Sequence, residues 1–257
     1  MTLRMLLATL LLLACASGSA QAERMVVSIS NHQVSVLSNF VGENLVLFGT
    51  VESDDGKPLR SSYDLVVTVV GPRETMRARR KQRVLGIWVN VDSREFVRVP
   101  SYLAVLSNRP VAQIANADTL RQLQVGIDNF LLPQRIGPDI GDTAPDNPFR
   151  VAFVRLETDY GLYRESDDGV TFLTPTVFRA AIPLPANAPT GSYGVDVKLF
   201  AEGTLVAHAG SALQVTKAGV EQYLADAARD HGLLYGIATM LMALLTGWIA
   251  SVVFRKD

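Results

Sequence analysis

The chain has 257 residues, of which 48% are hydrophobic and 19% are charged, and its formal net charge is -1. This balance excludes an intrinsically disordered chain, which has few apolar residues and a high net charge. Twelve prolines and nineteen glycines are ordinary numbers, which excludes collagen-like and low-complexity classes. Because basic residues are not in excess, we expect no nucleic acid among the partners.

The first 22 residues predict a signal peptide for export. Arg4 supplies a positive charge, residues 5–14 form an apolar run too short to cross a bilayer, and residues 20–22 are an A-x-A cleavage site. We therefore expect the mature chain to begin at Glu23. The alternative is lipidation at Cys15, because the four residues that end there resemble a bacterial lipoprotein box.

Between the two ends of the chain, residues 23–218 predict a mainly β domain. Short runs rich in β-branched residues alternate with turn signals over residues 25–106 and again over residues 170–215. This pattern predicts an Ig-like antiparallel β-sandwich. The two β regions form either one sandwich or two small β domains, and one sandwich is favoured because the last strands alone are too few to bury a core.

A helical insertion of about residues 110–165 separates the two β regions. Its first predicted helix has apolar residues at spacings of three and four, although Gly126 weakens the pattern; they are Leu120, Leu123, Ile127, Phe130 and Leu131. Its second predicted helix is capped by Asp146 and carries one apolar face. That face comprises Phe149, Ala152, Phe153, Leu156, Tyr160 and Tyr163.

A basic run lies over residues 73–83, between two predicted strands, with Glu74 as its only acid. One interpretation is a solvated hairpin loop. The other is a site for an anion, a lipid headgroup or an acidic partner, because guanidinium groups suit oxyanions. The candidate binding residues are Arg77, Arg79, Arg80, Lys81 and Arg83. Trp88, in a strand predicted over residues 84–91, is expected in the core.

Residues 233–254 predict a transmembrane helix, reached through a helical stalk at residues 219–232. The span contains no charge and would be about 33 Å long, enough for a hydrocarbon core of about 30 Å. Acidic residues precede it and Arg255 and Lys256 follow it, so the positive-inside rule places the tail, residues 255–257, in the cytoplasm. The predicted signal peptide places the domain on the opposite side of the membrane.

A stripe of small residues runs along the predicted span at spacings of three and four. It predicts close packing against a partner helix or a second copy, since lipid offers no hydrophobic drive for association. The alternative is composition alone, because such residues are common in spanning helices. The stripe residues are Gly236, Thr239, Ala243, Gly247 and Ala250.

Several spaced motifs carry a family resemblance that covers nearly the whole mature chain. The chain resembles the alphaproteobacterial transmembrane protein family Alph_Pro_TM. The resemblance implies a bacterial inner-membrane protein with a periplasmic domain and implies no activity; an exporter of the sulfite or sulfonate type is a hypothesis about its partner. The matching segments are residues 80–90, 100–108, 148–150, 161–163, 182–185, 189–193 and 235–255.

No catalytic pattern is present in the sequence. It has no HExxH, G-x-S-x-G or P-loop motif, and its three histidines are far apart. We expect no enzyme, no metal and no cofactor. The sequence instead predicts a membrane-anchored periplasmic interaction or accessory protein that partners an inner-membrane transporter. The alternative is an oxyanion-binding module that uses residues 73–83, and an enzyme of unknown type ranks third.

Overall fold

The structure is a computed structural model that describes residues 23–37, 40–52, 62–137, 139–142, 144–217 and 228–253. The predicted signal peptide with Cys15, the tail at residues 255–257 and most of the predicted stalk lie outside these residues. The expected mainly β fold with several antiparallel sheets and one C-terminal apolar helix is confirmed.

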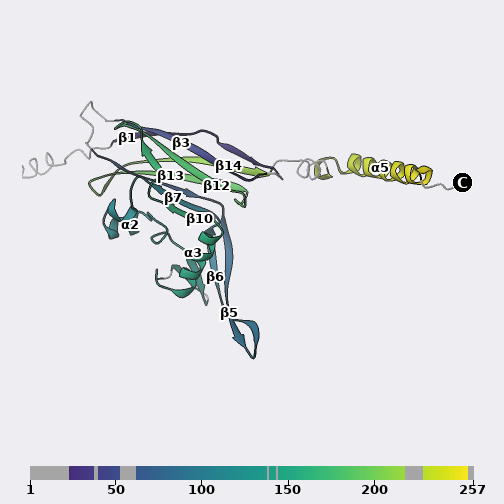
Figure 1. The fold of residues 1–257 in the computed structure, drawn as a ribbon, viewed down its shortest axis with the longest axis horizontal. Coiled ribbons are helices and arrows are strands. Elements are labelled where there is room, and N and C mark those ends of the chain that lie inside the picture. Colours follow the sequence, from purple (N-terminus) through teal and green to yellow (C-terminus); the bar gives the residue numbers. More distant parts are fainter. Residues whose placement is uncertain are drawn as a thin grey trace, which may run out of the picture.

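Two sheets pack face to face to form a sandwich (Figure 1). The first has the strand order β1-β3-β12-β11, and the second has the order β10-β7-β4-β13-β14-β2. The strands of the first sheet are β1 (Arg24–Ile29), β3 (Gly42–Glu52), β11 (Val170–Phe172) and β12 (Val177–Pro185). Those of the second are β2 (Gln33–Val36), β4 (Asp64–Val70), β7 (Leu103–Ser107), β10 (Tyr163–Ser166), β13 (Gly191–Ala201) and β14 (Thr204–Lys217).

Strands from both β regions of the sequence build the same two sheets. In the first sheet β12 pairs with β3, and in the second β13 pairs with β4. Most pairs are antiparallel, but β10 runs parallel to β7 and β2 runs parallel to β14. The inner position of β14, between β13 and β2, places the last strand before the apolar helix inside the sheet.

Strand β4 is buried on both faces, because two separate cores lie against it. Leu65, Val67 and Val69 point into the core between the two sheets. Val66 points to the opposite face, where it joins a second core. The second sheet is therefore the middle layer of the domain, and the insertion covers its outer face.

A third sheet has the order β5-β6-β8-β9. Its strands are β5 (Arg73–Val84), β6 (Ile87–Pro100), β8 (Pro133–Ile136) and β9 (Asp139–Asp142). Strands β5 and β6 form a long hairpin that extends away from the sandwich (Figure 1); we call this hairpin the arm. Only Phe96 of the arm pairs with β8, so most of the arm is a two-stranded ribbon.

The insertion contains less helix than the sequence predicts. A 3-10 turn at Val111–Gln113 precedes α2 (Ala117–Gln122), whose cap Asn116 accepts the Thr119 N–H. The helix predicted through Leu131 ends after Gln122, because the backbone turns left-handed at Gln124 and Gly126, with φ of 52° and 93°. This left-handed backbone cannot continue a right-handed helix.

Helix α3 (Pro148–Asp159) forms where the second helix is predicted, with two corrections. Its cap is Asn147 and not Asp146, since the Asn147 side chain accepts the N–H groups of the next turn. The predicted apolar face is only partly used: Phe153 is buried, whereas Leu156 and Tyr160 are exposed. The second buried residue is Arg150, which the apolar pattern could not indicate.

Helix α5 (Gly232–Val253) is an apolar helix long enough to cross a membrane. Over Gly232–Ser251 its side chains are not buried by the described part of the chain, as expected for a helix whose surface faces lipid.

Candidate functional site

The basic run forms strand β5 of the arm and is not the loop that the sequence suggests. The strand ends at a two-residue turn, Leu85-Gly86, whose φ angles are 50° and 86°. Two consecutive positive φ angles are typical of the type I′ turn, which matches the twist of paired strands. The strand predicted over residues 84–91 begins only at Ile87, because the turn separates it from Val84, which ends β5.

The cations of the arm differ in how they are paired. Arg77 lies 4.0 Å from Glu95, and Arg83 donates from Nε to the Gly86 carbonyl at 3.2 Å. Within the described part of the chain, no carboxylate forms an ion pair with Arg79, Arg80 or Lys81. These three side chains are exposed and keep their full charge available for a ligand.

The acid directly across the arm does not neutralise these cations. Asp92 lies opposite Arg80 in the strand register. Its Oδ1 atom instead accepts hydrogen bonds from the Ser93 N–H and from Nη1 of Arg94, both at 2.8 Å. The arm therefore presents a surplus of positive charge along β5.

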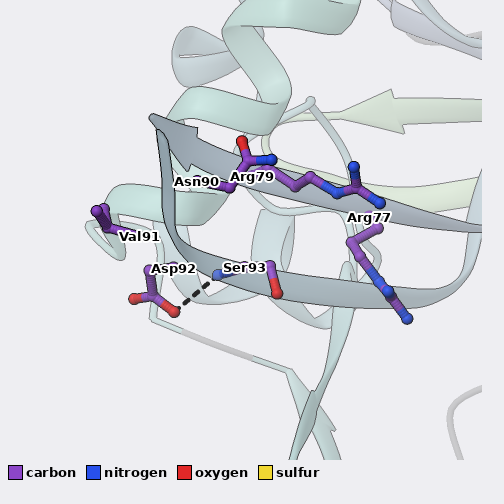
Figure 2. Close-up of a pocket in the computed structure, with 6 residues that line it drawn as sticks. All are labelled: Arg77, Arg79, Asn90, Val91, Asp92 and Ser93. Carbon is purple, nitrogen blue, oxygen red and sulfur yellow. Dashed lines mark hydrogen bonds between the residues drawn. The ribbon is translucent and has the colours of Figure 1, made fainter. Parts of the chain in front are cut away.

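One side of the arm is hollowed by a polar pocket of about 330 Å³ (Figure 2). Arg77 and Arg79 enter it from β5, and β6 supplies the polar groups opposite them. We call it the arm hollow; its lining is Arg77, Arg79, Asn90, Val91, Asp92 and Ser93. Guanidinium, amide and hydroxyl donors in one hollow are groups that bind a small oxyanion.

A second depression of about 250 Å³ lies between β5 and α3, and we call it the arm–helix groove. Its floor is largely apolar and its rim is cationic. The floor residues are Ala78, Pro148, Phe149, Ala152 and Leu156, and the rim residues are Arg79, Arg80, Lys81 and Arg155. Like its neighbours on β5, Arg155 has no ion-pair partner within the described chain. The groove thus suits a ligand that is anionic and partly apolar.

Aromatic contacts fix α3 against the base of the arm. The rings of Phe96 and Phe153 stack with centroids 4.3 Å apart, and Phe153 meets Tyr163 edge to face at 5.9 Å. The guanidinium of Arg94 lies 5.0 Å from the centre of the Phe149 ring. Such pairs add to the stabilisation from burial alone, and they hold the two walls of the groove together.

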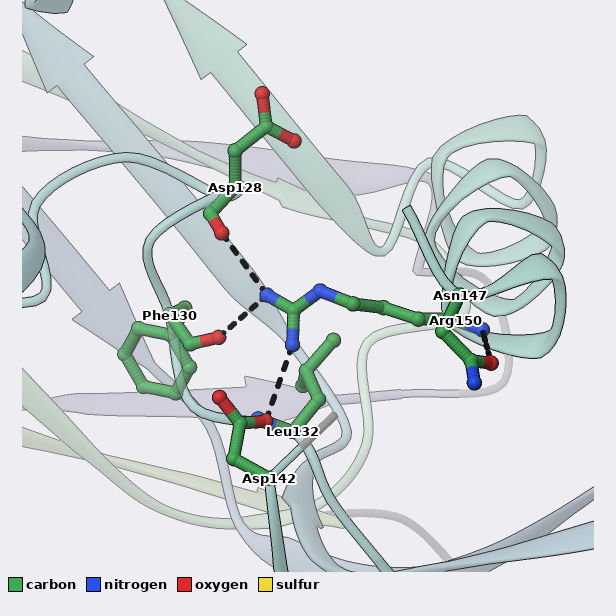
Figure 3. A network of polar contacts seen from close by, with 6 residues as sticks. All are labelled: Asp128, Phe130, Leu132, Asp142, Asn147 and Arg150. Atoms are coloured by element: carbon green, nitrogen blue, oxygen red, sulfur yellow. Dashed lines mark hydrogen bonds and ion pairs between the residues drawn. The ribbon is translucent and has the colours of Figure 1, made fainter. Parts of the chain in front are cut away.

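Buried Arg150 holds the other side of α3 (Figure 3). Its Nη2 atom donates to the carbonyls of Asp128 at 3.0 Å and Phe130 at 2.7 Å, and its Nη1 atom donates to Oδ1 of Asp142 at 3.2 Å. The same carboxylate oxygen accepts the Leu132 N–H at 3.0 Å. Arg150 therefore ties α3 to the segment before β8 and to the end of β9, and is not free to bind a ligand.

Trp88 is not in the core, contrary to the prediction. It is 68% exposed, near the turn of the arm. The arm extends beyond the sandwich, so no layer covers either face of its outer end. The sequence did not lead us to expect exposed apolar residues around a turn here. The Leu-Gly pair between apolar residues was the signal that could have indicated the turn.

The stripe of small residues lies on α5 without a neighbour in the described structure. A side chain added at Gly236 or Gly247 would meet nothing within 4 Å outside its own helix. The Thr239 hydroxyl donates to the carbonyls of Tyr235 at 3.0 Å and Gly236 at 2.9 Å, so its polar group is satisfied within the helix. The structure brings none of the stripe residues close to the arm cations.

The shifted acids of the domain lie in its body and not on the arm. Burial raises the pKa of Glu165, which accepts the Ile127 N–H at Oε2. Burial also raises the pKa of Glu157 on α3 and of the buried tyrosines Tyr102 and Tyr163. Among the described residues, no cluster of three or more His, Cys, Asp or Glu side chains is placed to hold a metal ion.

The chain matches one family model over residues 24–256, that of the family described as "Putative transmembrane protein" (Alph_Pro_TM). No curated protein matches the chain closely enough to be a relative. The family match covers the sandwich, the arm, the insertion and α5 together, so the chain belongs to the Alph_Pro_TM family of transmembrane proteins.

Proposed function

We propose that this membrane-anchored protein is an accessory subunit whose domain lies in the periplasm and docks on an inner-membrane transporter through the arm. The observation that carries the proposal is the set of cations that line the arm–helix groove without ion-pair partners in the described chain. An anchor in the bilayer brings the domain next to other membrane proteins. The basic arm then selects a partner with an acidic exported face.

The arm is well suited to docking because the backbone that carries its charges is already paired in a ribbon. Twelve residues of β5 and fourteen of β6 form one paired ribbon, so its backbone loses little freedom on binding. The rim charges are exposed, and exposed charges act mainly on association rate and specificity and are screened by salt. Partner recovery should therefore fall as the salt concentration rises.

A second candidate function is the capture of a small oxyanion by the arm hollow. The hollow is lined mostly by polar groups, and two of them are guanidiniums. Such a module would present an anion such as sulfite or sulfate to the transporter. The two sites share Arg79, but Arg77 lines only the hollow and Lys81 and Arg155 line only the groove, so the candidates are separable by experiment.

The docking test compares two variants of the full chain. Lys81→Gln with Arg155→Gln removes rim charges of the groove, whereas Arg179→Gln with Lys217→Gln removes two exposed cations outside the arm. After purification in a mild detergent, the groove variant should recover the partner at least about five-fold less well, as loss of about 1 kcal/mol implies. Equal recovery by both variants would refute docking through the groove.

The oxyanion test uses Arg77→Gln, which removes a guanidinium of the arm hollow only. Titration of the full chain with inorganic sulfate and sulfite, followed by calorimetry, should show binding that this variant weakens about ten-fold. The thermal unfolding midpoint should stay unchanged, because Arg77 is exposed and its ion pair with Glu95 is long. No binding by the unmodified chain would refute the oxyanion function.

A further inference from the structure

The end of the arm carries an exposed apolar cluster that neither the partner site nor the anion site uses. Leu85 is fully exposed, Ile87 and Trp88 are 66% and 68% exposed, and Val84 is 43% exposed. We call these four residues the tip. They flank Gly86 at the turn, on the part of the arm most distant from the sandwich (Figure 1).

Folding of the hairpin does not require an apolar tip. The first position of a type I′ turn favours Asn, Asp or Gly, because a side chain at positive φ is strained. Leu85 occupies that position with φ 50°, and no atom lies within 4 Å of a side chain built at the neighbouring Gly86. A bulky residue that is both strained and fully exposed indicates a contact with something outside the chain.

Cations lie directly behind the tip on the same strand. Arg83 pairs with Trp88 in the register, and Lys81 and Arg80 follow toward the sandwich. At about 3.3 Å per residue, the distance from Val84 back to Lys81 is about 10 Å. Apolar groups within the first 5–10 Å of a bilayer and basic groups at its phosphates are the arrangement of a surface-inserted segment.

We propose that the tip inserts into the lipid leaflet that faces the domain, in the same membrane that holds α5, with Lys81 and Arg83 against anionic phospholipid headgroups. The tether supports this occupant, because an anchored chain meets its own bilayer at a high effective concentration. The inference shares Lys81 with the docking proposal, but Arg83 and the four tip residues line neither the groove nor the arm hollow, so the tip can be tested separately.

The two tryptophans of the chain make a direct test available. Trp248 lies in α5, so Trp248→Phe leaves Trp88 as the only reporter. The full-length variant is reconstituted into phosphatidylcholine vesicles with or without 30% phosphatidylglycerol, about the range in which surface charge attracts basic segments. We expect blue-shifted emission, quenching by lipids brominated near the headgroup, protection from iodide, and a stronger effect in the anionic vesicles.

Variants that suit the turn separate insertion from folding. Leu85→Asn with Ile87→Thr keeps residues that favour a hairpin and removes most of the tip's apolar surface. It should reduce lipid quenching of Trp88 at least about five-fold. Val41→Asn, at an apolar residue that is 89% exposed outside the arm, should leave the quenching unchanged. Iodide-accessible emission in both vesicle types, or equal quenching in the tip variant, would overturn the proposal.

A photo-crosslinking residue at position 85 in native membranes distinguishes the occupants. Crosslinks to phospholipid support the proposal. Crosslinks to a protein or to a second copy of the chain, in place of lipid, overturn the proposal that the tip inserts into the bilayer. That result would not change the outcome of the docking test at Lys81 and Arg155.

Discussion

Replacement of Arg150 by methionine should destabilise the domain, although it keeps the length and the apolar stem of the side chain. The change removes three charged hydrogen bonds and leaves the carbonyls of Asp128 and Phe130 without their donor. Each such bond contributes about 1.5–3 kcal/mol. Loss of one partner from a buried ion pair costs about 3–5 kcal/mol. The side chain of Asp142 is 36% exposed and regains water, so we expect a loss of about 3 kcal/mol in the free energy of unfolding.

The measurement is urea unfolding of the full chain in detergent, followed by near-ultraviolet circular dichroism of the buried tyrosines. Arg155→Met on the same helix is the matched control, because Arg155 is exposed and unpaired in the described chain. It should change the free energy of unfolding by no more than about 0.5 kcal/mol. A loss below about 1 kcal/mol for Arg150→Met would refute the reasoning, since the network would then contribute no more than one ordinary hydrogen bond.

Three further predictions concern the membrane orientation, an acid on β10 and the span. A reporter active only in the periplasm should work when fused after Lys217 and be silent after Asp257; activity after Asp257 would reverse the orientation. Burial raises the pKa of Glu165, so its protonated form contributes stability that is lost as pH rises above about 4.5. Glu165→Gln should flatten the fall in the free energy of unfolding that is measured as pH rises from 4.5 to 7. An unchanged slope in the variant would contradict this prediction. Ala243→Leu with Gly247→Leu should preserve insertion but reduce recovery of a partner or crosslinked dimer several-fold, and equal yields would show that the stripe is composition alone.

Features set by local patterns could be predicted from the sequence. The alternation in β12 buries Phe178, Ala180, Ile182 and Leu184 on one face, as the period of a half-buried strand requires. The apolar run of α5 was equally plain. Local patterns of this kind identify the fold class because burial of one strand face is decided within a few residues.

Features set by distant contacts could not be predicted in the same way. The apolar strand around Trp88 has the pattern of a core strand, and only its distance from the sandwich leaves the side chain exposed. Arg150 resembles a surface cation, yet its partners come from chain segments eight to twenty-two residues away. The groove could not be foreseen at all, because it exists only where α3 packs beside the arm.

The position of β14 determines how the domain resists mechanical load from its anchor. The strand is the last one before the membrane helix in the described chain; its residues Gln214–Lys217 pair with β2 on one side, and its residues from Thr204 to Val215 pair with β13 on the other. A pull on the tether along the strand therefore loads both rows of hydrogen bonds in shear, so many bonds must break together. Had β14 been an edge strand turned across the pull, its bonds would open one after another. A load applied along β14 is thus shared with the strands on both of its sides and does not peel β14 from the sheet.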